Sequence, residues 1–259
     1  MVLNRIKNKI YRSIKKILTQ IGFGVKCNIC HNKTLRFGSD AWHEFVICQN
    51  CGSQIRHRLL MAAFQHTDDF NYKKIIENRT ILHFAPDLCL RNFFEVKSKK
   101  YLTADFMAEG YSYDSISLNI DISMMSVLQD NSIDVLLALD VLEHVPNHLE
   151  ALTESFRVLK SGGICIFTIP QKDGLDKTFQ DNTFVSPEER IKHYGQWDHL
   201  RIYGNDFKEF MKNVGFNVTV IDENFFSQNL VNKHVLFPPI LSSNPLATNY
   251  RKVYFGIKN

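Results

Sequence analysis

The sequence predicts an α/β fold in which helices cover a mostly parallel sheet. The clearest observation is a strand–helix–strand unit between residues 132 and 170. Residues 133–139 are a nearly unbroken apolar run, which is typical of a strand buried on both faces of a parallel sheet. This run ends in Asp140, an acid placed where such a strand meets solvent. Ligands bind beyond the carboxyl ends of strands in open α/β sheets, so we expect a functional site there.

The helix of this unit is expected to begin at Asn147. Its apolar residues recur at helical spacing, which predicts one buried face made of Leu149, Leu152, Phe156 and Leu159. The sequence Ser161-Gly162-Gly163 is expected to end the helix, because glycine tolerates the left-handed conformation of a helix end. Residues 164–169 then predict the second buried strand.

Upstream, three shorter apolar segments predict further strands, each followed by an acid. They cover residues 80–84, 101–105 and 118–121, and the acids at or after the ends of all four strands are Asp87, Asp105, Asp121 and Asp140. An acid about 20 residues past the first strand–helix turn is where a nucleoside-binding site hydrogen-bonds ribose hydroxyls, and Asp105 has this spacing. Downstream, residues 207–214 predict an amphipathic helix, 216–222 a strand, and 252–257 a last antiparallel strand at the edge of the sheet.

Composition limits the possible classes. The chain of 259 residues suits one catalytic domain with a small appendage, and its 44% hydrophobic and 22% charged residues are ordinary for a globular protein. The net charge of +4 is too small for a dedicated nucleic-acid binder. No apolar run approaches the roughly 18 residues of a membrane span, and no secretory signal is visible. We therefore expect a cytoplasmic protein.

Two Cys-x-x-Cys pairs predict a zinc site near the N-terminus. Their members are Cys27, Cys30, Cys48 and Cys51. Each pair forms a tight turn that places both thiolates on one side, and two such turns complete a tetrahedron. Four thiolates fill the coordination shell, so the zinc is expected to be structural. The alternative of two unrelated pairs of free cysteines is weaker.

Residues 1–22 predict a basic amphipathic helix. Six basic residues and no acid fall in the first twenty positions, and isoleucines recur at spacings of three and four. Two interpretations stay open: contact of residues 1–21 with an anionic membrane surface on the inner face, or packing of the helix on its own domain or on a second subunit. The second interpretation is favoured, because such stripes are ordinary packing faces.

Four sequence runs resemble a known family. The runs ALDVLEHVPN and FRVLKSGG are similar to class I S-adenosylmethionine-dependent methyltransferases of the type 11 branch, and LHFAPD and DHLRIYG to a bacterial subgroup with a cysteine-rich N-terminal segment. The resemblance covers about residues 27–222. It implies a Rossmann-like class I sheet, mostly parallel with an antiparallel last strand. The domains would be the helix at 1–22, a zinc ribbon at 23–56 and the methyltransferase domain at 57–259.

The resemblance also implies the roles of the strand-end residues in binding S-adenosylmethionine. Asp105 would accept the ribose hydroxyls, Asp121 would meet the adenine amino group, and Ile122 would cover the ring. The first strand–helix turn and the fourth strand end would surround the methionine end, through Phe84, Ala85, Pro86, Asp87, Asp140 and Val141. The first turn departs from the family, because it has no glycine.

Residues 171–204 are too long for an ordinary connection, which predicts a lid over the substrate. Within it, Ser186 and Pro187 predict the start of a helix. A polar cluster follows, of which we expect His199 to act as a base, Arg201 to hold an anionic substrate group and Asp198 to belong to the same catalytic group.

Two further sets of residues have competing interpretations. His144 is expected to hold the rim of the sheet rather than to transfer protons. The cluster Arg56-His57-Arg58 either meets a phosphate or carboxylate, or forms a solvated face with ion pairs to the zinc ribbon; these remain equal.

The reaction expected from the cofactor is methyl transfer to a hydroxyl or amine of a small or glycan-type substrate, in cell-surface saccharide biosynthesis. An RNA base methyltransferase with a zinc module is the main alternative, although basic and acidic residues nearly cancel outside residues 1–20. The second alternative is a non-catalytic zinc-ribbon interaction protein.

Overall fold

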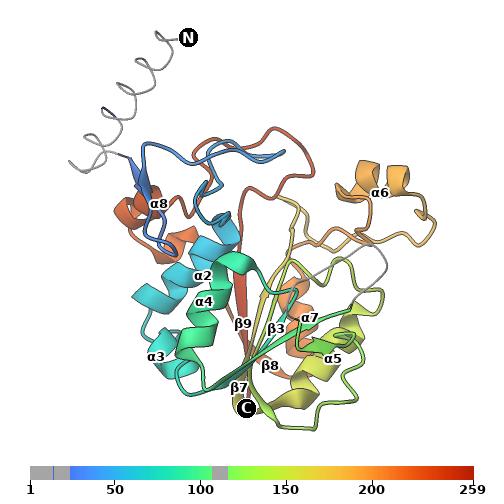
Figure 1. The fold of residues 1–259 in the computed structure, drawn as a ribbon. Coiled ribbons are helices and arrows are strands. Elements are labelled where there is room, and N and C mark those ends of the chain that lie inside the picture. Colours follow the sequence, from blue (N-terminus) through green and yellow to red (C-terminus); the bar gives the residue numbers. More distant parts are fainter. Residues whose placement is uncertain (1–13, 15–23, 107–115) are drawn as a thin grey trace.

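The computed structural model describes residues 14, 24–106 and 116–259, and Figure 1 shows its course. The helix expected over residues 1–22 falls, apart from residue 14, outside this description. A seven-stranded sheet forms the centre, in the order β5-β4-β3-β6-β7-β9-β8. The strands are β3 Thr80–Phe84, β4 Lys100–Asp105, β5 Leu118–Asn119, β6 Ile133–Leu139, β7 Leu159–Thr168, β8 Phe216–Ile221 and β9 Val253–Lys258.

All neighbouring strands pair in parallel except those that contact β9. The predicted Rossmann-like, mostly parallel sheet with an antiparallel last strand is therefore confirmed. The predicted position of that strand at the edge is wrong, because β9 lies between β7 and β8 and leaves β8 at the edge. The last strand follows β8 in the chain and pairs with both neighbours, and local sequence cannot indicate such an insertion.

Two layers of helices cover the sheet, and alternate residues of β6 show why both layers are needed. Leu136 and Ala138 pack into a cluster with α5 (His148–Val158) and α7 (Phe207–Val214). Val135 and Leu137 face the opposite cluster, with α2 (Ile55–His66) and α4 (Leu88–Lys97). Figure 1 shows these two layers on either side of the strands. Helix α3 (Tyr72–Ile75) also contributes to the second cluster.

Helix α5 is shorter than expected, and its predicted apolar face is only partly right, since Leu152 is buried and Phe156 packs against the core. It ends at Val158, and Leu159 already begins β7, so Ser161-Gly162-Gly163 lie inside a strand. The buried residues of the helix are Ala151, Leu152, Ser155 and Val158, while Leu149 is half exposed. A small residue at position 151 lets the helix approach the sheet closely, a contact that the apolar pattern alone does not reveal.

The cysteine-containing segment sits beside α8 (Gln228–His234) at the upper end of the sheet (Figure 1). Its short strands β1 (Val25–Lys26) and β2 (Lys33–Thr34) pair antiparallel. Arg58 joins the two parts, since its fully buried guanidinium donates to the carbonyls of Val46, Ser53, His234 and Val235. Arg58 is therefore neither a ligand-binding nor a solvated residue.

The inserted segment 171–204 contains α6 (Pro187–Tyr194). The predicted start of this helix is confirmed, because Ser186 accepts a hydrogen bond from the backbone N–H of Glu189 and Pro187 occupies the first turn. Residues 223–250, which the sequence left unassigned, form the short 3-10 helix η1 (Glu223–Phe225), α8 and a long loop. Among the helices that the structure describes, none has the length and apolar character needed to cross a membrane.

Candidate active site

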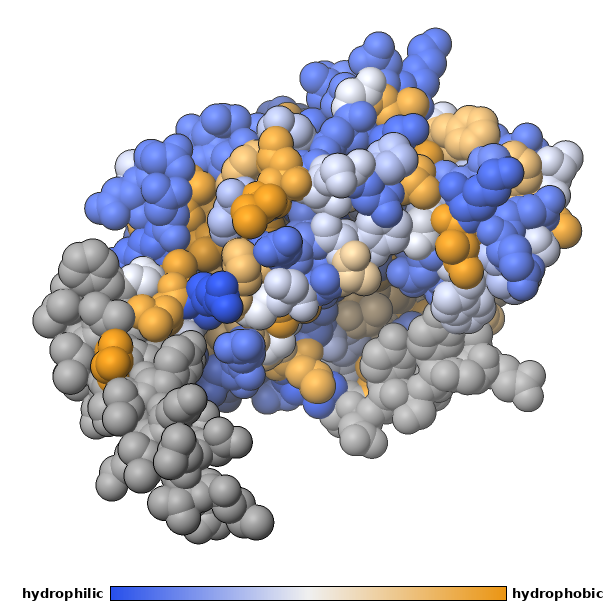
Figure 2. Space-filling model, turned by 90° about the horizontal axis from the view of Figure 1, so that it is seen from above, coloured by the Kyte–Doolittle hydropathy of each residue, from blue (hydrophilic) through white to orange (hydrophobic). Residues whose placement is uncertain are grey.

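The carboxyl ends of β3, β4 and β6 lie side by side at the upper edge of the sheet. Phe84 is in register with Ala104 on one side and with Ala138 on the other, so the residues that follow these strands share one rim. Figure 2 views this end of the molecule, whose surface is mainly hydrophilic with small groups of apolar side chains. The sequence-predicted row of acids is thus brought to one edge.

Asp105 has the environment expected of a ribose-binding acid. It ends β4 and is partly buried, and its Oδ2 is buried without a hydrogen-bond partner among the residues that the structure describes. Burial also raises the pKa of its carboxyl above the usual range. A buried oxygen without a partner is rare in proteins, and a hydroxyl donor from a ligand would satisfy it. The residues present therefore fit the nucleoside part of S-adenosylmethionine.

Asp87 lies in the first strand–helix turn but contacts α2 instead of capping its own helix. Its Oδ1 lies 2.9 Å from Nε2 of His57 and 3.3 Å from an Nη of Arg56. Burial alone would raise the pKa of Asp87, but His57 and Arg56 outweigh it and hold the pKa well below its usual range. Arg56 and His57 are thus neither solvated nor shown to meet a ligand, because the carboxylates that they contact belong to the chain itself.

Asp140 contacts side chains from distant parts of the chain. It is partly buried, and it accepts hydrogen bonds from Arg251 at 2.8 Å and from Thr168 at 2.8 Å, while Arg56 lies 3.5 Å away. Burial would raise its pKa, but Arg251 and Arg56 lower it overall. Asp140 has a positive φ of 54°, which turns the chain sharply at the end of β6. Val141, which follows, packs against the core from a half-buried position.

The predicted adenine residues are engaged locally. One carboxylate oxygen of Asp121 accepts the backbone N–H and the hydroxyl of Ser123, both at 2.7 Å. Ile122 is only 3% exposed and belongs to the core, so it presents little surface to a ring. Contact of these two residues with adenine remains a prediction.

The glycine-free first turn stores a small strain. Ala85 has a φ of 44°, a left-handed conformation that costs roughly 1 kcal/mol for a residue with a Cβ. We expect Ala85→Gly to stabilise the protein by about 1 kcal/mol, which raises its Tm by about 2 °C. Calorimetric melting would measure this shift. In the matched control, Ala151→Gly in the buried face of α5, the Tm should fall instead. A lower Tm for Ala85→Gly would contradict the inference that the first turn is strained.

A cavity of about 410 Å³ opens beside Asp140. Four parts of the chain line it: the cysteine-containing segment, the rim after β6 and β7, the inserted segment, and the loop before β9. The contributing residues used below are Trp42, Arg56, Asp140, Glu143, His144, His199 and Arg251. Asp87, Asp105 and Asp121 do not line it, so the cavity and the row of acids are two parts of the site that meet at Asp140.

His199 lines this cavity, as the predicted role of a base requires. Its Nδ1 is 3.2 Å from the carbonyl of Tyr194, which makes Nδ1 the protonated nitrogen and leaves Nε2 as an acceptor. Burial and the neighbouring His144 lower the pKa of His199 to about 4, so the imidazole is neutral at neutral pH. Asp198 contacts His144 rather than His199, with Oδ2 3.1 Å from Nδ1 of His144.

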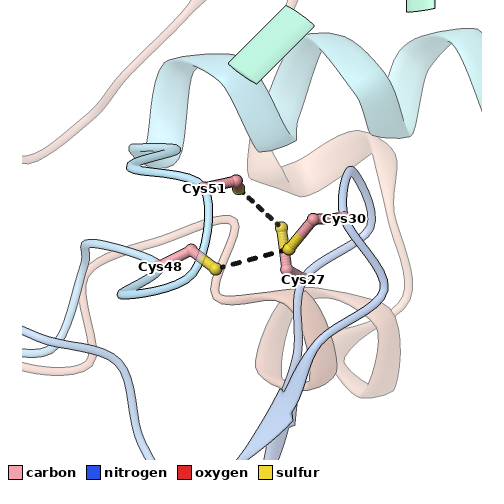
Figure 3. A group of neighbouring side chains, drawn as sticks. All are labelled: Cys27, Cys30, Cys48 and Cys51. Carbon is pink, nitrogen blue, oxygen red and sulfur yellow. Dashed lines mark hydrogen bonds between the residues drawn. The ribbon is translucent and has the colours of Figure 1, made fainter. Parts of the chain in front are cut away.

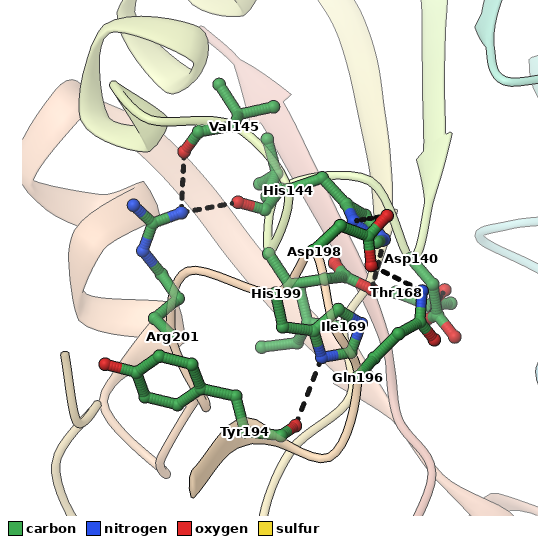
Figure 4. Close-up of polar contacts among 12 residues, drawn as sticks. Asp140, His144, Val145, Thr168, Ile169, Tyr194, Gln196, Asp198, His199 and Arg201 are labelled. Carbon is green, nitrogen blue, oxygen red and sulfur yellow. Dashed lines mark hydrogen bonds and ion pairs between the residues drawn. The ribbon is translucent and has the colours of Figure 1, made fainter. Parts of the chain in front are cut away.

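Arg201 does not hold a substrate anion, contrary to the prediction. Its side chain is fully buried, and it donates to the carbonyls of Leu142, Val145 and Pro146 and to Oε1 of Gln180. Figure 4 shows the contact with the carbonyl of Val145. With these donors occupied inside the protein, the guanidinium fixes the rim that carries Glu143 and His144. The sequence signal was an arginine beside a candidate base, which does not reveal burial.

Sequence reasoning missed three groups of this site. Glu143 is 1% exposed with Oε2 unpartnered among the described residues, and its pKa is raised by burial and by Asp140. Its position directly after β6 was the available signal. Arg251 and Trp42 gave no signal, because each comes from a distant part of the chain.

The four cysteines gather as predicted (Figure 3). The sulfur atoms of Cys27 and Cys51 are 3.8 Å apart, and those of Cys30 and Cys48 are 3.7 Å apart. A tetrahedral zinc with Zn–S bonds of about 2.3 Å requires sulfur–sulfur edges of about 3.8 Å, whereas a disulfide requires about 2.05 Å. The backbone N–H of Ile29 points to the sulfur of Cys27 at 3.4 Å, as in a metal-binding turn. The cluster therefore fits a structural metal ion.

Comparison with known proteins identifies the central part of the chain. Residues 98–167, which include β4, β6, α5 and most of β7, match the family described as Methyltransferase domain. This part of the chain therefore matches a methyltransferase domain. Together with the strand order and the antiparallel last strand, this match supports an S-adenosylmethionine-dependent methyltransferase with a cysteine cluster at the N-terminal side of the domain. No curated relative matches it in sequence.

Several solved methyltransferases are similar in structure. An S-adenosylmethionine-dependent methyltransferase from Mesorhizobium loti is 11% identical with a TM-score of 0.48, and the match covers 75% of this chain and all of the other. The 1,6-didemethyltoxoflavin-N1-methyltransferase of Burkholderia thailandensis is 11% identical with a TM-score of 0.47, covering 76% and 79%. Phosphoethanolamine N-methyltransferase 2 of Haemonchus contortus is 14% identical with a TM-score of 0.47, covering 77% and 51%. These likenesses leave the acceptor of this methyltransferase undetermined.

Proposed function

We propose that this methyltransferase transfers a methyl group to a hydroxyl or amine of a small, saccharide-type acceptor bound in the 410 Å³ cavity. The observation that supports it is the position of the cavity, directly beside Asp140 and walled by the inserted segment. Its volume lies within the roughly 300–1,000 Å³ of small-molecule sites. The side chain of Trp42 offers a flat apolar wall and Arg251 and Glu143 offer polar ones, a combination that suits a ring bearing hydroxyls.

The cofactor would bind along the rim of strand ends. Asp105 would hold the ribose, Asp121 and Ile122 the adenine, and the methionine end would lie between the first turn, Phe84–Asp87, and the Asp140-Val141 turn. Bound S-adenosylmethionine supplies a methyl group that is already electrophilic. The protein's task is to align the acceptor with it and to exclude water, for which the inserted segment would serve as the lid.

His199 would accept the acceptor's proton. As the acceptor oxygen or nitrogen forms its bond to the methyl carbon, the carbon–sulfur bond breaks and the proton moves to Nε2 of His199. The hydrogen bond to Tyr194 holds the imidazole in the tautomer that this step needs.

The cysteine cluster would bind structural zinc, and we place the protein in the cytoplasm, where thiolates stay reduced and available to metal. Contact of residues 1–21 with the inner face of a membrane would bring the enzyme close to saccharide carriers. This part of the proposal depends on the basic pattern of the sequence alone.

The proposal is tested by calorimetric titration with S-adenosylhomocysteine and by transfer of labelled methyl to nucleotide sugars, oligosaccharides and RNA. We expect cofactor binding in the micromolar range, and transfer to a saccharide. His199→Ala should lower kcat about 100-fold or more while cofactor affinity stays unchanged. The matched control is His193→Ala, because His193 stacks on Phe184 and does not line the cavity. Equal loss in both variants, or transfer only to RNA, would contradict the proposal.

A further inference from the structure

Three metal-ligating side chains converge at one wall of the cavity. Glu143 and His144 follow β6, and His199 comes from the inserted segment. Their ligand atoms all lie within 4.8 Å of one another, and Nε2 of His144 is 3.8 Å from Oε1 of Glu143. These residues are distinct from the cysteine cluster, and two histidines with one carboxylate are a donor set that divalent transition metals favour.

Neighbouring groups orient both imidazoles. Asp198 contacts Nδ1 of His144 at 3.1 Å, and the carbonyl of Tyr194 contacts Nδ1 of His199 at 3.2 Å. Both Nε2 atoms are thereby left as acceptors. Carboxylate or carbonyl partners on the far nitrogen are what metal-bound histidines almost always have. Figure 4 shows the His144–Asp198 and His199–Tyr194 contacts beside each other.

The backbone beneath the cluster is held rigidly. Arg201 binds the carbonyls of Leu142 and Val145, which flank the Glu143-His144 pair, and the carbonyl of Glu143 accepts the N–H of Leu200 at 2.9 Å. The same contacts tie the inserted segment to the rim, so the ligands from both segments keep a fixed relation. Such preorganisation is required of a metal site and explains why a fully buried arginine stands next to it.

One carboxyl oxygen of Glu143, a member of this cluster, is buried and unsatisfied. Glu143 is 1% exposed, and its Oε2 has no hydrogen-bond partner in the part of the chain that the structure describes. The imidazole at 3.8 Å is too distant for a hydrogen bond. Asp140, an acid near Glu143, is already bound by Arg251 and Thr168. A buried carboxylate without a partner is costly unless a cation or donor meets it.

We propose that Glu143, His144 and His199 bind a divalent first-row transition ion whose open positions face the cavity and hold the acceptor's hydroxyl oxygen. Metal–ligand bonds of about 2.0–2.2 Å place neighbouring ligand atoms about 3.0–3.5 Å apart, so the 3.8 Å pair must approach by roughly 0.3–0.8 Å. His144 is one-third exposed and can make this adjustment. The role of the ion rests on the proposed function: it lowers the pKa of the hydroxyl that receives the methyl group.

This ion changes the role of His199 in the transfer. With the ion bound, Nε2 of His199 is a ligand instead of the proton acceptor described above, so the proton lost from the acceptor hydroxyl leaves to solvent through the open side of the cavity. The oxygen then forms its bond to the methyl carbon as the carbon–sulfur bond breaks. An oxygen acceptor is therefore favoured over an amine, because a metal-bound amine would have its lone pair occupied.

The test is titration with Co²⁺ of the full-length protein that carries one equivalent of zinc, in its cysteine cluster, followed by visible absorption. We expect one equivalent to produce the d–d bands of a nitrogen–oxygen site, without the near-ultraviolet bands that thiolate ligands give. His144→Ala and Glu143→Gln should weaken Co²⁺ binding at least 10-fold, and Asp198→Asn about 10-fold through the orientation of His144. His193→Ala should leave it unchanged.

Absence of these bands in the wild-type protein would overturn the proposal, as would bands that persist equally in His144→Ala and Glu143→Gln. Thermal melts of each variant with and without S-adenosylhomocysteine show whether it folds and binds cofactor. Cofactor binding without Co²⁺ binding would overturn the metal site alone, whereas loss of cofactor binding in the wild type would overturn the proposed function.

Discussion

Loss of the metal from the cysteine cluster is expected to weaken cofactor binding about 30-fold or more, although the cluster does not line the cofactor's rim. The reason is the short path from Cys51 to the start of α2 at Ile55, which is followed at once by Arg56 and His57. These two side chains contact the carboxylate of Asp87 in the first turn. If the cluster opens, the start of α2 loses its anchor, and Asp87 keeps a buried charge without its partners. An unpaired buried charge costs several kcal/mol.

The measurement is calorimetric titration with S-adenosylhomocysteine before and after removal of the metal by a strong chelator, and again after zinc is restored. The Cys48→Ser, Cys51→Ser double variant should behave like the chelated protein. Cys89→Ala is the matched control, because Cys89 is free and lies outside the cluster.

A second variant separates the metal from the contact that it supports. Arg56→Met keeps all four cysteines, so it should retain zinc and still lose about 10-fold in cofactor affinity, through Asp87 and Asp140. If zinc-free protein binds S-adenosylhomocysteine as tightly as the wild type, the coupling between the cluster and the first turn does not exist.

The sequence predicted those parts of the fold that depend on local pattern. The apolar run 133–139 became β6 with its predicted bounds, and Gly215 ends α7 in the left-handed conformation. The predicted face of α5 was right in part: Leu152 is buried and Phe156 packs against the core, but Leu149 is half exposed. Ala151 and Ser155 are buried as well, by their fit against the sheet and not by their hydrophobicity. Close packing of small residues has no signature in an apolar pattern.

In the candidate site, the acids at strand ends were predictable because every parallel strand delivers its next residue to the same edge. Their partners were not, since Arg251 reaches Asp140 from the loop before β9 and Arg56 from the helix after the cysteines. Arg201 shows the same limit in reverse. An arginine next to a histidine suggests a substrate contact, yet Arg201 is buried and its guanidinium donates to the rim carbonyls of Leu142 and Val145.

Asp105→Ala is expected to weaken binding of S-adenosylhomocysteine about 100-fold. Two hydrogen bonds from ribose hydroxyls to one carboxylate are charge-assisted, and their loss costs about 3 kcal/mol. Asp105→Asn, which keeps the shape but removes the charge, should lose about 10-fold. Asp130→Ala is the matched control, because Asp130 is an exposed acid before β6, at the opposite end of the strands. Calorimetric titration of the three variants and the wild type measures these differences.

The pH dependence of this binding gives an independent check. Burial raises the pKa of Asp105, so its carboxylate is protonated at a higher pH than an exposed aspartate. Only the charged form is a strong acceptor for both hydroxyls, and cofactor affinity should therefore begin to fall while ordinary aspartates are still ionised. Bound cofactor favours the carboxylate and shifts this fall to lower pH, because the proton and the ribose compete for the same oxygens. If S-adenosylhomocysteine binds Asp105→Ala and the wild type with the same dissociation constant, Asp105 at the end of β4 does not contact the ribose. The unpartnered Oδ2 of Asp105 would then have no ligand assigned to it.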